Sequence, residues 1–110
     1  MEFTPRKFKF KAWNTESRLL MRLSSVECNK GELVKQDHVL LQYTGLLDKE
    51  GEEIYEMDVV MISTDQFVVF WDEQRKGWHY TRLGQHSPLA LEPAITARMK
   101  RFCSWFELQR

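Results

Sequence analysis

The side chains best suited to chemistry lie in an acidic stretch near the middle of the chain. Its carboxylates belong to Glu52, Glu53, Glu56 and Asp58. Two carboxylates held close together could transfer protons or bind Mg²⁺. Acid–base catalysis requires surroundings that separate the two pKa values, whereas a charged run beside a glycine turn is usually solvated. We therefore expect a structural role for this stretch, with no catalytic residues and no enzyme activity.

Histidine and cysteine side chains are the other candidates. His38, His79 and His86 lack the short spacings of metal-binding motifs, so we predict no metal site and no cofactor. His79 alternates with aromatic residues, which indicates a histidine on the surface of a strand. Cys28 lies in a polar stretch and Cys103 among aromatic residues, and neither has a catalytic partner beside it. Two cysteines without a signal peptide favour free thiols and a cytoplasmic protein.

Length and composition narrow the class of protein. A chain of 110 residues predicts one domain, residues 1–110. No apolar run is long enough to cross a membrane. The sixteen basic and sixteen acidic side chains cancel, whereas a protein that coats nucleic acid usually has net positive charge. Seven Phe and four Trp exceed what so small a core can hide, which predicts an exposed apolar patch for protein contact.

Basic side chains gather near both ends of the chain. On an exposed edge strand, lysines prevent edge-to-edge aggregation, and we favour this interpretation. The same side chains could instead follow a phosphate backbone while Trp13 stacks on a base. A third possibility is that this patch meets the acidic stretch of another copy in a closed ring. The candidate interaction residues are Lys7, Lys9, Lys11, Trp13, Arg98, Lys100 and Arg101.

The N-terminal half must position these residues on strands. Strict alternation of apolar and basic residues predicts a half-buried strand over Lys7–Trp13, with its lysines facing water. Asn14–Ser17 has turn chemistry, and Leu19–Leu23 is the expected hairpin partner. The polar segment Cys28–Asp37 predicts a loop, and a third strand follows over Val39–Leu46.

The second half predicts a meander of short strands. Asp48–Gly51 is a turn, with Asp opening it and Gly closing it. Asp58–Ser63 and Gln66–Trp71 form a predicted hairpin, and Trp78–Leu83 returns after a further turn at Asp72–Gly77. Such spacing favours a mainly β fold, an N-terminal hairpin followed by a small, twisted, barrel-like sheet.

The C-terminal part is less regular. Ser87 and Pro88 could begin a short helix, which Pro93 would interrupt. The segment Arg98–Leu108 has a spacing compatible with a helix and a density of aromatic residues typical of a strand. We favour a closing strand.

Three segments of the sequence are similar to segments of a known protein family. They are KFKAWN, LLQYTGLLDKEGEEIYEMDVV and VVFWDEQRKGWHY, at Lys9–Asn14, Leu40–Val60 and Val68–Tyr80, and together they give the resemblance to the YopX family of phage and prophage proteins. The matching positions are Ala12, Trp13, Gln42, Tyr43, Thr44, Gly45, Leu46, Asp48, Gly51, Ile54, Tyr55, Glu56 and Asp58. Met57 stands where the family generally has Gly, so the bend there is either ordinary or strained.

The resemblance implies a compact β domain encoded by phages or mobile elements, and it brings no catalytic residues. Its central block is best interpreted as structural, with carboxylates such as Asp58 and Asp72 accepting backbone N–H groups. Our leading prediction is a non-enzymatic accessory protein of the bacterial cytoplasm that acts by protein contact. It would form a homo-oligomer and could also bind a host or phage protein. The alternative is a small nucleic-acid-binding module.

Overall fold

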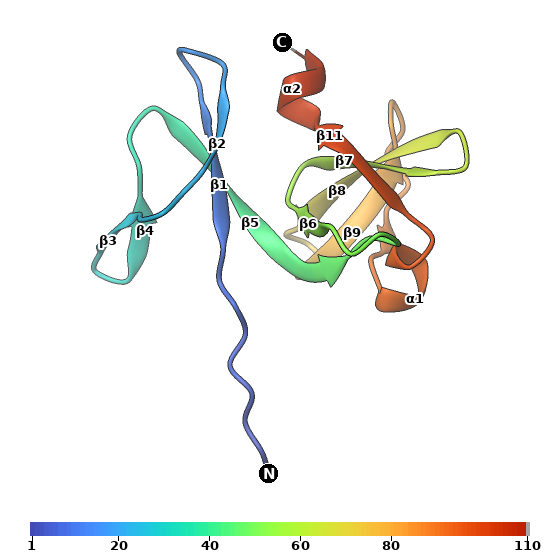
Figure 1. Ribbon diagram of the computed structural model, residues 1–110, viewed down its shortest axis with the longest axis horizontal. Coiled ribbons are helices and arrows are strands. Elements are labelled where there is room, and N and C mark those ends of the chain that lie inside the picture. The colour runs from blue at the N-terminus through green and yellow to red at the C-terminus, as the bar shows by residue number, and fades with distance from the viewer. Residues whose placement is uncertain (110) are drawn as a thin grey trace.

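Figure 1 shows a computed structural model of the protein, in which residues 1–109 are described. The chain is mostly β, and the predicted hairpin and curled sheet are confirmed. One sheet has the order β2-β1-β5-β6, with β1 (Phe10–Asn14), β2 (Leu20–Arg22), β5 (His38–Leu47) and β6 (Glu53–Tyr55). The second has the order β10-β9-β8-β7-β11, with β7 (Asp58–Ile62), β8 (Asp65–Asp72), β9 (Gly77–Arg82), β10 (Leu89–Ala90) and β11 (Lys100–Ser104).

The remaining elements are short. A separate hairpin consists of β3 (Glu27–Asn29) and β4 (Glu32–Val34), and the helices are α1 (Pro93–Thr96) and α2 (Trp105–Gln109). Neither of these helices within residues 1–109 has the length and apolar character needed to cross a membrane.

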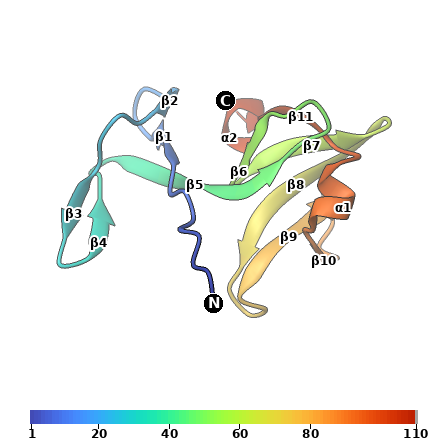
Figure 2. The ribbon, with the colours of Figure 1, turned by 60° about the horizontal axis from the view of Figure 1, so that its bottom comes forward.

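The chain is divided into two lobes joined by β5 (Figures 1 and 2). The first half of β5 pairs with β1 in the N-terminal lobe, and the second half pairs with β6 in the larger lobe. Within the second half, the register of the pairing with β6 shifts between Tyr43 and Leu47, and Gly45 there has a φ of +87°. A bulge with glycine in this conformation bends a strand, which lets β5 serve both lobes.

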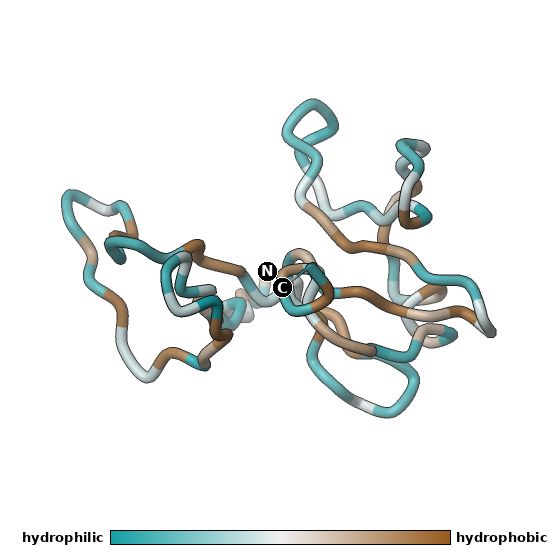
Figure 3. The backbone as a smooth tube through the Cα atoms, turned by 90° about the horizontal axis from the view of Figure 1, so that it is seen from above, coloured by the Kyte–Doolittle hydropathy of each residue, from teal (hydrophilic) through white to brown (hydrophobic). Residues whose placement is uncertain are grey.

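The hydrophobic core lies in the larger lobe. Figure 3 shows hydrophobic segments following its strands, and the core contains Ile54, Val60, Val69, Tyr80, Leu91 and Met99. The central position of β7, between β8 and β11, buries Val59 and Val60 completely. Burial of these apolar side chains is the main favourable term in folding.

The first strand differs from its prediction. It begins at Phe10 rather than Lys7, and Lys11 is buried instead of facing water. Both faces of β1 are covered. On one face, the Trp13 ring stacks on Phe106 of α2 with centroids 5.5 Å apart, and the Lys11 ammonium lies 4.4 Å from the centroid of the Tyr55 ring. On the other face, Ala12 is completely buried. In a strand covered on both faces, side chains do not alternate between buried and exposed, although the sequence alternates between apolar and basic residues.

The loop predicted over Cys28–Asp37 is wrong, because this region contains the β3–β4 hairpin. Its turn has positive φ at Lys30 (52°) and Gly31 (85°), the pattern of a two-residue hairpin turn that follows the twist of strands. All six residues of the two strands are exposed. Burial therefore imposes no hydrophobic alternation on the sequence here.

Two C-terminal predictions are corrected. The helix does not start at Ser87: Leu89–Ala90 is a strand, and the helix begins at Pro93. Proline suits the first helical turn, where no backbone N–H is needed for the ladder. In Arg98–Leu108, the predicted strand is right for Lys100–Ser104 and wrong afterwards, where α2 follows.

Candidate functional site

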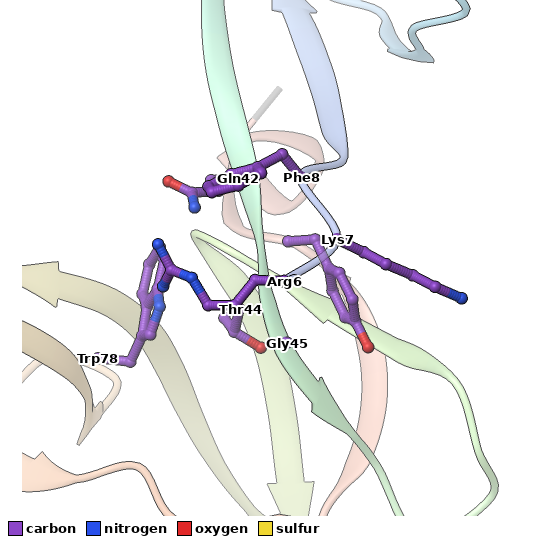
Figure 4. Close-up of a pocket in the computed structure, with 8 residues that line it drawn as sticks. Arg6, Lys7, Phe8, Gln42, Thr44, Gly45 and Trp78 are labelled. Atoms are coloured by element: carbon purple, nitrogen blue, oxygen red, sulfur yellow. The ribbon is translucent and has the colours of Figure 1, made fainter. Parts of the chain in front are cut away.

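A groove lies where the N-terminal arm, residues 1–9, passes over β5 and β9. One part of it is a hollow of about 350 Å³, whose lining residues are drawn in Figure 4. A neighbouring hollow of about 310 Å³ shares three of its lining residues, so we treat the two as one groove. The lining residues of the second hollow are Arg6, Gln42, Glu56, Trp71 and Trp78.

Two tryptophans form one wall of the groove. Trp71 on β8 is the cross-strand partner of Trp78 on β9. Their ring centroids are 5.2 Å apart at an interplanar angle of 80°, an edge-to-face arrangement. Trp71 Nε1 also donates a hydrogen bond to Glu73 Oε2 at 2.9 Å. The indole rings are thereby fixed in place, and Trp71 remains exposed.

The hollow that both tryptophans line also contains a carboxylate held by backbone contacts. Glu56 N donates to Gln42 O at 2.8 Å, and Gln42 N donates to Glu56 Oε1 at 3.3 Å. Glu56 lies in the turn between β6 and β7, where it is half-buried. Burial raises the pKa of Glu56, and the hydrogen bond from Gln42 offsets only part of this effect.

Arg6 enters the groove from the arm. Its side chain borders both hollows, and Figure 4 shows it extending toward the side of the groove that carries Trp78. Lys7, the next residue, extends in the other direction in the same view. The guanidinium carbon of Arg6 also lies 5.1 Å from the centroid of the Phe8 ring.

The seven candidate interaction residues do not form one continuous open surface. Lys9 Nζ lies 2.6 Å from Glu53 Oε2, and Lys100 Nζ lies 2.6 Å from Glu50 Oε2. Arg101 is paired with Asp58, while Trp13 is buried. Lys7 and Arg98 are exposed. Lys11 and Arg101 are brought together at a hollow of about 310 Å³, with Arg22 and Tyr55 also in its lining.

The acidic stretch serves several separate contacts. Asp48 is buried, and its Oδ1 accepts N–H groups from Glu50 at 2.8 Å and Glu52 at 2.9 Å. Asp48 Oδ2 accepts the N–H of Arg101 at 2.8 Å. The predicted turn at Asp48–Gly51 is confirmed by these bonds and by a φ of +82° at Gly51.

The predicted roles of two aspartates at turns are also confirmed. Asp58 Oδ2 accepts the N–H of Tyr55 at 2.8 Å, and Asp72 Oδ1 accepts the N–H groups of Gln74 and Arg75. These bonds satisfy backbone donors that the tight turns would leave without partners. Between Tyr55 and Asp58, Met57 adopts a φ of +65°, so the bend keeps the left-handed conformation that glycine favours.

Histidines and cysteines lie apart from the groove. Within residues 1–109 no group of three or more His, Cys, Asp or Glu side chains is placed to hold a metal ion. His79 lies on β9 as predicted but is buried rather than on the surface, and its Nδ1 lies 3.0 Å from Gly77 O. Cys28 and Cys103 are both free thiols.

The sequence reasoning missed most of the groove. Trp71 and Trp78 flank the predicted turn Asp72–Gly77, so hairpin register alone could have placed them opposite each other. The position of Arg6 over them had no sequence signal, because a segment without alternation or turn residues does not reveal where it lies.

Comparison with known proteins supports the resemblance seen in the sequence. A family model described as YopX protein matches residues 6–97. No curated protein matches the chain. Among solved structures, protein EF1440 from Enterococcus faecalis is similar, with a TM-score of 0.67 and 15% sequence identity. The similarity covers 96% of this chain and 98% of EF1440, and at this identity it shows a shared fold.

Proposed function

This chain belongs to the YopX family, and we propose that it is a non-enzymatic accessory protein that works by self-association and protein contact. We further propose a phage or prophage origin and action in the cytoplasm of the bacterial host. The supporting observation is the exposed β3–β4 hairpin of the N-terminal lobe, together with other exposed apolar side chains in the N-terminal half.

The β3–β4 hairpin has little support from the rest of its own chain. It pairs with no third strand among residues 1–109, and all six of its strand residues are exposed. Leu33 and Val34 on β4 are 39% and 43% exposed. An isolated two-stranded hairpin is marginally stable in water, and apolar side chains on such a surface favour an interface.

Other parts of the N-terminal half also expose apolar side chains. Leu19 and Met21 in the first hairpin are exposed, as are Phe3 and Phe8 on the arm. Covering such apolar side chains with another copy removes them from water, which favours association. These residues supply the contact surface of the proposed oligomer.

The nucleic-acid alternative has weaker support from the geometry. Lys9, Lys100 and Arg101 already contact carboxylates, and the stacking candidate Trp13 is buried against Phe106. A phosphate backbone would have to compete with those carboxylates for the same cations. We therefore propose self-association rather than nucleic-acid binding as the main activity.

Light scattering coupled to size-exclusion chromatography tests the proposal. We expect a mass at micromolar concentration of two or more times the 13.2 kDa of a single chain. Leu33→Glu and Val34→Glu should shift the protein toward the monomer, because they place charge in the contact surface. Leu89→Glu is the matched control, an exposed leucine on β10 in the other lobe. A wild-type mass of 13.2 kDa at every concentration would overturn the proposal.

A further inference from the structure

The groove holds a half-buried carboxylate that lacks a cation. Among residues 1–109, the ion pairs within 4.0 Å involve other acidic groups and none involves Glu56. The hydrogen bond from Gln42 N leaves Glu56 Oε2 available. Removing a carboxylate from water is unfavourable, and a nearby positive charge would offset this effect.

The wall beside that carboxylate suits a planar cation. Trp71 and Trp78 line the same hollow as Glu56, and Trp71 is exposed. An indole face attracts a cation, and a guanidinium can stack on it while donating hydrogen bonds to a carboxylate. Together the three side chains have the chemistry of a receptor for an arginine side chain.

Arg6 already borders this hollow, and it is carried by a segment with few ties to the body. Residues 1–9 form neither strand nor helix. Within them, the backbone contact to the body is at Lys9, whose O accepts the N–H of Tyr43 at 2.8 Å. Phe3 and Phe8 remain exposed. A terminal segment with so few contacts can change places between identical copies, because the same contacts form again in the partner.

We propose that the groove formed by Glu56, Trp71 and Trp78 is the binding site for Arg6 on the arm of a second copy. This inference rests on the proposed self-association and assigns it a specific contact. The second copy is the occupant because its arm has the sequence that already borders the groove. The arm contributes a positive charge, and the groove contributes an unpaired negative charge.

Single variants of the full chain test the contact. Arg6→Glu and Glu56→Gln should each weaken self-association about tenfold, as measured by sedimentation equilibrium. Glu56→Gln keeps the oxygen that accepts the Gln42 N–H, and Arg6 lies on the exposed arm, so both variants should keep the fold. Arg98→Glu is the matched control, with the same change of charge on an exposed arginine that lines neither hollow of the groove. It should have less than a threefold effect.

Mixing the two variants separates exchange from docking within one chain. In a mixed pair, the intact Arg6 of the Glu56→Gln copy can reach the intact Glu56 of the Arg6→Glu copy. About half of the native Arg6–Glu56 contacts should then form, and association should be partly restored. If each arm docks on its own chain, both copies remain defective and mixing restores nothing, which overturns the inference. If Arg6→Glu and Glu56→Gln each associate as strongly as the wild-type chain, the inference is also overturned, but the proposed function still stands. A monomeric wild-type chain would overturn both.

Discussion

Arg101 donates two hydrogen bonds to Asp58, from Nε to Oδ2 at 2.9 Å and from Nη2 to Oδ1 at 3.3 Å. The side chains are 17% and 2% exposed. Burial raises the pKa of Asp58, and the bonds from Arg101 and Tyr55 offset part of that effect. This pair fastens β11, near the end of the chain, to the start of β7.

Removing the cation of this pair should be strongly destabilising. Arg101→Met leaves a buried carboxylate without its partner and should lower the free energy of unfolding by about 3–5 kcal/mol. Urea denaturation measures the loss. Lys100→Met is the control, since Lys100 is more exposed and its ion pair with Glu50 is screened by solvent, so the effect should be much smaller. Equal effects of the two substitutions would contradict the assignment of Arg101 as a buried anchor.

The Asp48 carboxylate should stabilise the fold in a pH-dependent way. Burial by itself would raise its pKa, but the N–H groups of Arg101, Glu52 and Glu50 bring that pKa below the ordinary 3.8. Its contribution is therefore present above pH 3.8 and is lost as pH falls through the lowered value.

We expect Asp48→Asn to lower the free energy of unfolding by about 1–3 kcal/mol at pH 7, because an amide nitrogen would face an N–H donor. Denaturation between pH 7 and pH 2 should show the difference from wild type shrinking at the acid end. The exposed Glu50→Gln is the control. A gap that stays constant over this pH range would contradict the prediction.

The backbone at Met57 should be relieved by glycine. Its φ is +65°, and its amide is held on both sides, by Met57 N donating to Val69 O and Trp105 N donating to Met57 O, each at 2.7 Å. A side chain in this conformation costs about 1–2 kcal/mol, which glycine would remove. Glycine also gives the unfolded chain more conformational freedom, and this cancels part of the gain in stability. Met57→Gly should therefore stabilise the protein by up to about 1 kcal/mol in thermal denaturation.

Gly51 provides the reverse test of the same effect. Its φ is +82°, and an added Cβ would meet nothing within 4 Å. Gly51→Ala should accordingly destabilise by about 1 kcal/mol through backbone conformation alone. If both substitutions changed stability in the same direction, strain at positive φ would not be their cause.

Lys11 should make the protein less stable at neutral pH than an apolar residue of similar size would. Burial lowers its pKa, and the positive charge of Arg101 lowers it further, while the Asp58 and Glu107 carboxylates oppose this and Arg22 adds to it. A cationic group with a lowered folded-state pKa is a penalty at pH values below that pKa, and stability rises as pH increases toward the ordinary 10.5.

Lys11→Met should therefore match or exceed wild-type stability at pH 7, by up to about 1 kcal/mol. The difference should narrow between pH 7 and pH 10 in urea denaturation. Lys7→Met, on the exposed arm, is the control and should show no such trend. A variant advantage that grows with pH would contradict the sign of the pKa shift.

Two kinds of element could be predicted from the sequence: strands whose side chains alternate between buried and exposed, and turns that require Gly, Asn or Asp. The meander from Asp58 to Arg82 is the clearest case, because Gly, Asp and β-branched residues mark its turns and strands. The sequence could not predict the burial of Lys11, because the cover on that face comes from residues far along the chain, Tyr55 among them.

One missed element did have a local signal. Ser104 and Glu107 have the spacing of a capping box, and Ser104 N donates to Glu107 Oε1 at 3.0 Å while Phe106 N donates to Ser104 Oγ at 3.4 Å. That spacing could have ended the predicted strand at Ser104 and begun α2 at Trp105. Aromatic density outweighed it in the sequence interpretation.

The bend in β5 determines how the two lobes can adjust to neighbours. Pairing with β1 ends at Gln42, and the register shift toward β6 lies between Tyr43 and Leu47. Torsion changes confined to these few positions, with Gly45 among them, would swing the smaller lobe and leave the pairings β1–β5 and β7–β8 intact, while the contacts of Trp13 with Phe106 and of Lys11 with Tyr55 would have to change. In the proposed oligomer, the angle between neighbouring copies would therefore be set by the backbone torsions of a few residues in β5.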